Sequence, residues 1–342
     1  LSIGIVGLPN VGKSTLFKVL TKQEVNIANY PFATIDPNVG VVSVPDERLN
    51  KLTTLSRSKK TIPAVVEFYD IAGLVKGANK GEGLGNQFLS HIRETQAIVV
   101  VLRVFTDTDI IHVENSVDPL RDFGIINAEL ALKDLETVEK RLLKLESDAK
   151  NPATLASKKA AKDLEVLKHT KDELNKNNST LPFRDEEIVR ELQLLTAKKR
   201  IYLLNGKASD VPPELIQKIQ SLGAEYLIVN LATAEGIQEL ITKAYETLGL
   251  ISFFTTGEDE TRAWTIKQGS KAPEAAGVIH TDFEKNFIRA EVIGCKELIT
   301  ASPSTDSGQS PWAIAKQKGL IRLEGKEYVV QDGDVMVVRH GL

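Results

Sequence analysis

The sequence predicts an α/β fold in which a doubly wound, mostly parallel sheet is interrupted by a helical hairpin and followed by a small β-rich domain. Three observations predict it. Short continuous apolar runs alternate with helical stretches, a long strand-free stretch carries two heptad seams, and the last part of the chain is rich in short strands and turns. With 342 residues, the chain is long enough for two or three folded units.

Six apolar runs are typical of strands that are buried on both faces of a parallel sheet, because they are continuous and do not alternate with polar residues. They are Ser2–Val6, Val39–Val44, Ala64–Tyr69, Ala97–Val104, Lys199–Leu204 and Glu225–Val229. Helical stretches separate them. We therefore expect one sheet domain formed by residues 1–110 and 198–250.

Residues 111–197 are predicted to form an inserted arm. One seam of apolar residues, with steps of three and four, comprises Ala128, Ala131, Leu135, Val138, Leu142 and Leu145. Asn151 and Pro152 break the pattern, and a second seam follows at Ala160, Leu164, Leu167, Lys171 and Leu174. Two helices with facing seams and a turn between them predict an antiparallel hairpin that interrupts the sheet domain.

Residues 251–342 are predicted to form a separate β-rich domain. Strand-like runs occur at Ile288–Ile293, Glu327–Val330 and Val335–Arg339. Asp332-Gly333 lies between the last two runs and predicts a hairpin there.

The segment from Gly7 to Ser14 reads Gly-Leu-Pro-Asn-Val-Gly-Lys-Ser and satisfies the phosphate-binding pattern G-x-x-x-x-G-K-S. It follows a short apolar strand and opens a helix, which is the context that the pattern requires. In this motif backbone N–H groups and the helix N-terminus surround phosphate oxygens. We expect Lys13 to reach the β- and γ-phosphates, Ser14 to bind Mg²⁺, and Thr15 to donate to the α-phosphate.

A D-x-x-G element, Asp70 to Gly73, directly follows the strand that ends at Tyr69. Asp70 is predicted to hold Mg²⁺ through water, and the N–H of Gly73 to sense the γ-phosphate. Thr34 lies in the stretch between the first two strands, where a threonine completes the Mg²⁺ shell only when the γ-phosphate is present. Thr21 and Thr53 lie nearby, so position alone does not single out Thr34.

Longer motifs point to one family. Residues 74–89 read Leu-Val-Lys-Gly-Ala-Asn-Lys-Gly-Glu-Gly-Leu-Gly-Asn-Gln-Phe-Leu, which is similar to the glycine-rich second switch of Obg-like nucleotide hydrolases. Together with Tyr30-Pro-Phe-Ala-Thr34, the arm, and the stretch from Lys271 to Lys285, this resembles the YchF family of Obg-like ATPases across essentially the whole chain.

The resemblance implies a P-loop G-domain, a coiled-coil insertion and a C-terminal TGS domain of the β-grasp type. It also implies that ATP is preferred over GTP, that activity depends on Mg²⁺, and that the protein associates with the ribosome. Under the resemblance the nucleotide loop comprises Asn10, Val11, Gly12, Lys13, Ser14 and Thr15, and Mg²⁺ is held by Ser14 and Thr34.

Base recognition is predicted at Asn205 and Gly206, which directly follow the fifth strand-like run. GTPases place an aspartate at the fourth position of this motif, where it accepts hydrogen bonds from guanine, and adenine would leave that carboxylate unpaired. Here the fourth position is Ala208, which departs from the glutamate usual in the family. Asp210 comes two residues late and could substitute only if the loop rearranged. We therefore expect ATP preference with backbone contact at Gly206.

Catalysis requires a group that positions the attacking water. Ras-like enzymes use a glutamine directly after D-x-x-G, whereas this chain has Leu74 there. The candidate is His112, which follows the strand ending at Val104. A structural hydrogen bond is the other interpretation of that histidine.

Asn10 resembles the asparagines that help to coordinate K⁺, although a loop-shaping hydrogen bond explains it equally well.

Charge and composition set the expected partners. Lys144, Lys150, Lys158, Lys159 and Lys162 outnumber Glu146 and Asp148 near the tip of the arm, and this surplus could contact RNA phosphates, although a solvated face explains it too. The net charge of −3 argues against a globally basic DNA binder. A single cysteine, Cys295, excludes an intrachain disulfide and fits the cytoplasm. We expect a monomer with no membrane segment.

The sequence thus favours a P-loop ATPase with Lys13 and His112 as its catalytic residues. Two alternatives stay open: a GTPase of ribosome assembly, and a slowly hydrolysing, nucleotide-regulated module that binds RNA or the ribosome. Ala208 argues against the first alternative, and Leu74 favours the second.

Overall fold

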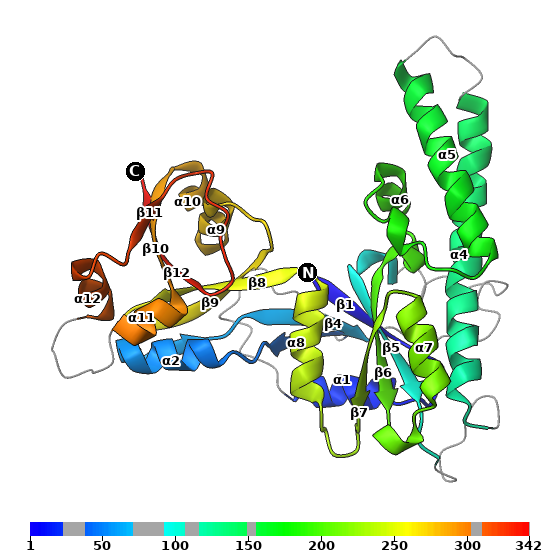
Figure 1. The fold of residues 1–342 in the computed structure, drawn as a ribbon, viewed down its shortest axis with the longest axis horizontal. Coiled ribbons are helices and arrows are strands. Elements are labelled where there is room, and N and C mark those ends of the chain that lie inside the picture. The colour runs from blue at the N-terminus through cyan, green and yellow to red at the C-terminus, as the bar shows by residue number, and fades with distance from the viewer. Residues whose placement is uncertain (23–37, 71–91, 107–115, 149–154, 302–309, 342) are drawn as a thin grey trace. The chain divides into compact units, whose positions relative to one another are not determined.

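The computed structural model describes residues 1–22, 38–70, 92–106, 116–148, 155–301 and 310–341 (Figure 1). These residues form two compact units. The first contains residues 1–22 and 38–40 and the described residues between 67 and 240. The second contains residues 41–66 and the described residues between 241 and 341. Residues 41–66, which lie within the predicted range of the sheet domain, thus fold with the C-terminal part of the chain.

The first sheet has six strands in the order β2-β4-β1-β5-β6-β7. They are β1 (Ser2–Val6), β2 (Val39–Ser43), β4 (Val65–Asp70), β5 (Ala97–Arg103), β6 (Lys199–Asn205) and β7 (Glu225–Val229). The five strands from β4 to β7 are parallel. The backbone bonds Val44 N to Ala64 O and Asp70 N to Asn38 O make β2 antiparallel to β4. The predicted α/β fold with a mostly parallel sheet is confirmed.

Continuous apolar composition explains the central place of β5, because every residue of this strand is buried. The helices that accompany the sheet are α1 (Lys13–Thr21), α7 (Pro213–Ser221) and α8 (Ile237–Thr247). Helix α7 has a proline in its first turn, where the missing N–H costs no hydrogen bond, and buries Leu215 and Ile219. Short 3₁₀ turns form at η2 (Leu181–Phe183), η3 (Leu195–Ala197) and η4 (Ala208–Asp210).

Two long helices form the inserted arm, α4 (Pro119–Asp148) and α5 (Leu155–Asn175), which lie side by side in Figure 1. Apart from Ala128 and Lys171, the predicted seam residues pack into one apolar cluster. Its members include Ala131, Val138, Leu142, Leu145, Ala160, Leu167 and Leu174, with Leu135 and Leu164 packed against them. The short helix α6 (Glu187–Leu192) contributes Ile188 and Val189 to the same cluster. The predicted break at Asn151 and Pro152 lies outside the described residues.

The second sheet is mixed and has the order β11-β10-β12-β8-β9-β3. Its strands are β3 (Lys60–Ile62), β8 (Leu250–Thr256), β9 (Glu260–Lys267), β10 (Phe287–Gly294), β11 (Arg322–Glu324) and β12 (Asp334–His340). Its helices are α2 (Glu47–Ser56), α9 (Ala272–Ile279), α10 (Thr281–Lys285), α11 (Cys295–Ala301) and α12 (Pro311–Gln317). The predicted strands at Ile288–Ile293 and Val335–Arg339 are confirmed within β10 and β12.

One predicted strand of this unit is wrong. Glu327–Val330 forms no strand, and its pairing is limited to an isolated bridge between Val329 and Lys271. The Asp334 carboxylate explains the difference, because it accepts hydrogen bonds from the Tyr328 hydroxyl at 2.7 Å and from the Gln331 N–H at 2.9 Å. These bonds hold the segment as a turn. Asp332-Gly333 therefore leads directly into β12 and does not close a hairpin.

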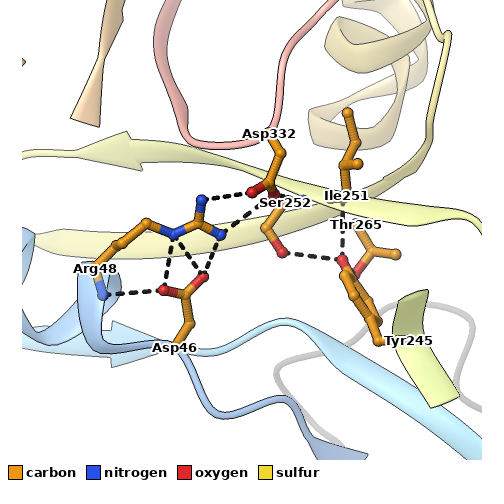
Figure 2. Close-up of polar contacts among 7 residues, drawn as sticks. All are labelled: Asp46, Arg48, Tyr245, Ile251, Ser252, Thr265 and Asp332. Carbon is orange, nitrogen blue, oxygen red and sulfur yellow. Dashed lines mark hydrogen bonds and ion pairs between the residues drawn. The ribbon is translucent and has the colours of Figure 1, made fainter. Parts of the chain in front are cut away.

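A polar cluster within the second unit joins α2 to the sheet (Figure 2). The Arg48 guanidinium donates to Asp46 Oδ2 at 2.8 Å and to Asp332 Oδ2 at 2.6 Å. Asp332 Oδ1 also accepts from the backbone N–H of Ser252 on β8 at 3.0 Å. Beside them, the Tyr245 hydroxyl lies 3.0 Å from Ser252 Oγ. Arg48 thus links α2 to the C-terminal sheet, although the two are far apart in the sequence.

Candidate functional site

The phosphate-binding motif forms a loop between β1 and α1. Gly12 has φ +109° and occupies the N-cap position of α1. A Cβ atom at Gly12 would lie 2.6 Å from the Asn205 side-chain nitrogen and 3.0 Å from Leu231 Cδ1. The loop therefore needs glycine here for two reasons, the backbone conformation and the close approach of two neighbouring loops.

Lys13 is 7% exposed, and its ammonium group donates a hydrogen bond to the backbone oxygen of Leu8 at 2.7 Å. Burial lowers the pKa of Lys13 to about 8, and the negative charge of Asp70 opposes this shift. Burial in turn raises the pKa of Asp70, and the charge of Lys13 opposes that rise. The two side chains thus form an electrostatically coupled pair at the ends of β4 and the phosphate loop.

A cavity of about 580 Å³ opens beside this loop. The loop side is lined by Asn10, Gly12, Lys13, Ser14 and Thr15, and the other side by Phe105, Asn205, Gly206, Lys207, Asp210, Asn230, Leu231 and Ala232. The second group follows the carboxyl ends of β5, β6 and β7. This is the edge at which parallel α/β sheets bind ligands.

The cavity brings together most of the residues that the sequence singles out. Val11 and Asp70 are not among the lining residues, although Val11 lies in the loop and Asp70 is coupled to Lys13. Thr34, Gly73, Leu74 and His112 lie outside the described residues.

Sequence reasoning missed Phe105, Lys207, Asn230, Leu231 and Ala232. The rule that ligands bind after the carboxyl ends of parallel strands could have found them, because they follow β5, β6 and β7 directly. Phe105 is further held by Arg103, whose guanidinium carbon lies 4.5 Å from the centre of the phenyl ring and whose Nε donates to the Phe105 backbone oxygen at 3.1 Å.

Asn205 is buried and braces the loops around the cavity. Its amide nitrogen donates to the Val11 backbone oxygen at 3.0 Å, and its amide oxygen accepts from the Leu231 N–H at 3.3 Å. The next residue, Gly206, donates its N–H to the Val229 backbone oxygen at 3.1 Å. A Cβ atom at Gly206 would lie 2.6 Å from Val104 Cγ2. These contacts fix the loop after β6 against its two neighbours.

Asp210 lies at the rim of the cavity, and its carboxylate is engaged by its own loop. Oδ1 accepts from the Ser209 hydroxyl at 3.0 Å, and Oδ2 accepts from the Lys207 N–H at 3.4 Å. Ala208 places no polar group at the fourth position of the motif. The only carboxylate in this loop thus serves to shape it.

The donor chemistry around the loop suits a hard divalent cation that is shared with phosphate oxygens. Ser14 supplies a hydroxyl to the cavity, and Asp70 supplies a carboxylate beside Lys13. Within the ranges that the structure describes, no group of three or more histidine, cysteine, aspartate or glutamate residues could hold a metal ion. The oxygen ligands of this loop therefore fit Mg²⁺, which usually keeps several waters and takes one or two protein ligands.

No helix in the described part of the chain is long and apolar enough to cross a membrane.

Two family descriptions match the chain. Residues 250–341 match the YchF-GTPase_C family, described as a protein of unknown function, and residues 2–159 match a family described as "50S ribosome-binding GTPase".

Similar proteins cover almost the whole chain. The "Ribosome-binding ATPase YchF" of Bacillus subtilis (strain 168) is 46% identical over 99% of this chain and 99% of that protein. The "Obg-like ATPase 1" of Schizosaccharomyces pombe is 41% identical over 98% of this chain and 93% of that protein. A solved structure, titled "Structure of the Schizosaccharomyces pombe YchF GTPase", aligns with a TM-score of 0.85 at 39% identity, and covers 99% of this chain and 97% of that one. From these full-length similarities and the matching C-terminal family, the chain belongs to the YchF family.

Proposed function

We propose that this chain is an Mg²⁺-dependent ATPase that acts as a nucleotide switch on the ribosome. The observation that carries this proposal is the cavity itself, which joins a phosphate loop with a buried lysine to a base-binding end that lacks a guanine-selecting carboxylate at Ala208. Relatives named "Ribosome-binding ATPase YchF" match from end to end, which supports both the nucleotide and the partner.

The triphosphate lies along the phosphate loop in this proposal. Lys13 binds the β- and γ-phosphates, and the burial of its ammonium group strengthens that attraction, because little water competes with it. The backbone N–H groups of the loop and the Thr15 hydroxyl hold the remaining phosphate oxygens. Ser14, Thr34 and Asp70 would hold Mg²⁺, which would supply positive charge beside the phosphates when bound.

Adenine is read by the backbone at Gly206. The Gly206 N–H already donates to Val229, so contact with the base uses the carbonyl oxygen. A carbonyl accepts a hydrogen bond from the exocyclic amine of adenine, whereas guanine presents an oxygen at that position. Because Asp210 is engaged within its own loop, preference for ATP over GTP follows.

His112 is proposed to position the attacking water, since Leu74 cannot form a hydrogen bond. K⁺ beside Asn10 would add positive charge near the β- and γ-phosphates. Asn10 has φ +61° and lines the cavity on the side of the phosphate loop, which supports this role. The N–H of Gly73 senses the γ-phosphate in the same proposal.

The arm is proposed to contact ribosomal RNA, although its charge is smaller than the sequence alone indicates. Lys159 Nζ lies 3.0 Å from Glu187 Oε1, and Lys162 Nζ lies 3.3 Å from Glu186 Oε2. Both carboxylates belong to or flank α6, and they neutralise two of the lysines counted at the tip. Phosphate contacts therefore depend on other cations such as Lys144 and Lys158.

The remaining proposals concern location, assembly state and domain boundaries. The protein acts in the cytoplasm as a monomer, with neither DNA nor a membrane as its partner. The mixed sheet of the second unit supports a β-grasp, TGS-like domain at residues 251–342. The arm is proposed to span residues 111–197 and the G-domain residues 1–110 and 198–250, although residues 41–66 of that range belong to the second compact unit.

Two measurements test the proposed function. Calorimetric titration with ATP and with GTP in the presence of Mg²⁺ should give tighter binding of ATP, and equal or tighter binding of GTP would favour the GTPase of ribosome assembly instead. Hydrolysis of ATP should be faster with ribosomes and K⁺ than without them. If ribosomes leave the rate unchanged, the chain is a binding module, and a His112→Ala variant with an unchanged stimulated rate would remove His112 from the catalytic set.

A further inference from the structure

Helix α4 runs without interruption from the first sheet into the arm, and its early turns are fastened to β6. The Asn127 side-chain oxygen accepts from Arg200 Nη1 at 2.6 Å and from the Tyr202 hydroxyl at 2.9 Å. The rings of Phe123 and Tyr202 lie 5.2 Å apart. Arg200 and Tyr202 belong to the strand that ends at Asn205 beside the cavity. The root of the arm is thus joined through one strand to the nucleotide site.

A second fastening lies about two helical turns further along α4. The carboxylate of Asp134, which is fully buried, accepts from the Leu195 N–H at 2.9 Å and from the Thr196 N–H at 2.7 Å. It also accepts from the Thr196 hydroxyl at 2.6 Å, and the same hydroxyl lies 2.6 Å from Thr180 Oγ1. Asp134 therefore ties α4 to the turn before β6 and, through Thr196, to the segment that follows α5.

A third contact is made by Arg93. Its Nη2 donates to the Thr137 hydroxyl oxygen on α4 at 2.6 Å. The backbone oxygen of Arg93 accepts from Lys198 Nζ at 3.0 Å, and the same ammonium donates to the backbone oxygen of Thr95. Arg93 lies in a helical turn at 92–94 that leads into β5. In sequence this turn directly follows residues 71–91, which include the D-x-x-G glycine at Gly73.

We infer that Arg93 couples the nucleotide site to the arm, through its hydrogen bond to Thr137. Asn127 and Asp134 anchor α4 to β6 and to the turn before it. Arg93 contacts the same helix from the turn at 92–94, which follows Gly73 in the sequence. A displacement of that segment would pull on α4 at Thr137 while the two anchors hold. Coupling of this kind is reciprocal, so a partner bound to the arm would change nucleotide affinity by the same factor.

This inference rests on the proposed function for the nucleotide, for the γ-phosphate-sensing role of Gly73 and for the identity of the partner. Its first test uses the full-length protein without ribosomes, so that the result does not depend on the partner. Hydrogen–deuterium exchange over residues 133–141 should differ between the complexes with ADP and with a non-hydrolysable ATP analogue in Mg²⁺. Arg93→Ala and Thr137→Val should each remove most of that difference, because valine keeps the shape of threonine but cannot accept the bond. Thr137→Ser should retain the difference.

Arg141→Ala is the matched control on the same helix. Arg141 Nη2 faces Glu191 Oε2 of α6 at 4.0 Å, so this variant removes an arginine of α4 without touching the turn at 92–94. Its exchange difference should equal that of the wild-type protein. The inference is overturned if the wild-type protein shows no difference between nucleotides, if Arg93→Ala and Thr137→Val keep it, or if Arg141→Ala loses it.

The second test measures the ratio of ribosome affinities in the ATP-analogue and ADP states. Arg93→Ala and Thr137→Val should each bring this ratio about 2- to 30-fold closer to one, and the double variant should do no more than either alone. Additive effects overturn the inference. Hydrolysis without ribosomes should stay within twofold of wild type in both variants. If the exchange difference is present but ribosome affinity is independent of nucleotide, the proposed function fails while the internal coupling stands.

Discussion

The side-chain nitrogen of Asn205 donates a hydrogen bond to the backbone oxygen of Val11 at 3.0 Å, and so joins the end of β6 to the phosphate loop. The same amide accepts from the Leu231 N–H at 3.3 Å. One buried side chain therefore holds two loops that line the cavity, and the shape of the site depends on it.

Asn205→Ala should weaken the binding of ATP and of ADP by about tenfold to a hundredfold, because a buried carbonyl and a buried N–H lose their partner at a cost of about 1–3 kcal/mol. Isothermal titration calorimetry measures both affinities. Asn178→Ala is the control, since Asn178 bonds only to an exposed glutamate, Glu173, among the contacts found for its side chain in the described structure. ADP affinity unchanged within twofold would show that the loop keeps its shape without Asn205.

Gly12→Ala should abolish nucleotide binding, because alanine is strained at φ +109° and its Cβ would press on Asn205 and Leu231. The chain offers a matched control in Gly124, where an added Cβ meets nothing within 4 Å and the residue lies inside α4. Gly124→Ala should raise the free energy of unfolding by about 0.5–1 kcal/mol and leave ATP binding intact. Thermal unfolding and calorimetry on both variants check the pair. Retained ATP binding in Gly12→Ala would contradict the strained-loop argument.

ATP affinity should fall as the pH rises above 8. Burial lowers the pKa of Lys13 to about 8 in the protein without nucleotide, and a polyanion favours the protonated ammonium, so binding near pH 8.5 takes up a proton. The dissociation constant should increase by up to about tenfold per pH unit above that value. Calorimetry at pH 8.5 in two buffers of different ionisation enthalpy counts the protons directly. A constant affinity from pH 7.5 to 9.5 would contradict this linkage.

The lowered pKa of Lys13 also affects stability: ATP affinity should fall as the pH rises, whereas the free energy of unfolding should increase. Because the pKa of Lys13 in the folded protein lies below its ordinary value of 10.5, the unfolded chain binds a proton that the folded chain has already released. The free energy of unfolding of the nucleotide-free protein should therefore gain a positive contribution as the pH rises from about 8 towards 10.5. Denaturant titrations across that range, with Lys13→Met as the reference, measure this contribution.

Arg48→Met should destabilise the second unit by about 1–2 kcal/mol, since two charge-assisted contacts with Asp46 and Asp332 are lost at a half-exposed site. Hydrogen exchange should quicken in α2. Lys51→Ala, which removes an exposed i,i+4 ion pair with Glu47 on the same helix, should cost no more than about 0.5 kcal/mol. Equal decreases in the free energy of unfolding in the two variants would mean that the Arg48 contacts contribute no more than ordinary surface ion pairs.

The phosphate end of the site was predictable because its residues are contiguous. Lys13, Ser14 and Thr15 follow one another in a motif whose geometry is set by the loop and the first turn of a helix. Phe105 and Leu231 were not predicted, because they enter the cavity from different strand ends and only the order of strands in the sheet brings them together. A motif search identifies residues that are close together in the sequence, whereas Phe105 and Leu231 are close together only in the folded sheet.

The fold shows the same limit. Helical periodicity predicted the arm, since Val138 and Leu167 are fully buried in its seam. Periodicity could not show that residues 60–62 pair with β9 of the C-terminal sheet, because a three-residue strand carries too little pattern. The failed strand at 327–330 has a related cause. Its β-branched composition is right for a strand, but the Asp334 carboxylate offers its backbone and side chains a competing turn.

The length of α4 magnifies small changes at the base of the arm. Asp134 is the outer of the two anchors of this helix, and about 14 residues, or ~21 Å of helix, extend beyond it to Asp148. A tilt of ~10° about Asp134 would move the far end by ~4 Å, whereas Thr137, ~4.5 Å from the pivot, would move by less than ~1 Å. A sub-ångström adjustment beside Thr137 thus becomes a displacement at the far end of α4 that is large enough to make or break a direct contact. In this geometry the helix acts as a lever that Arg93 contacts close to its pivot.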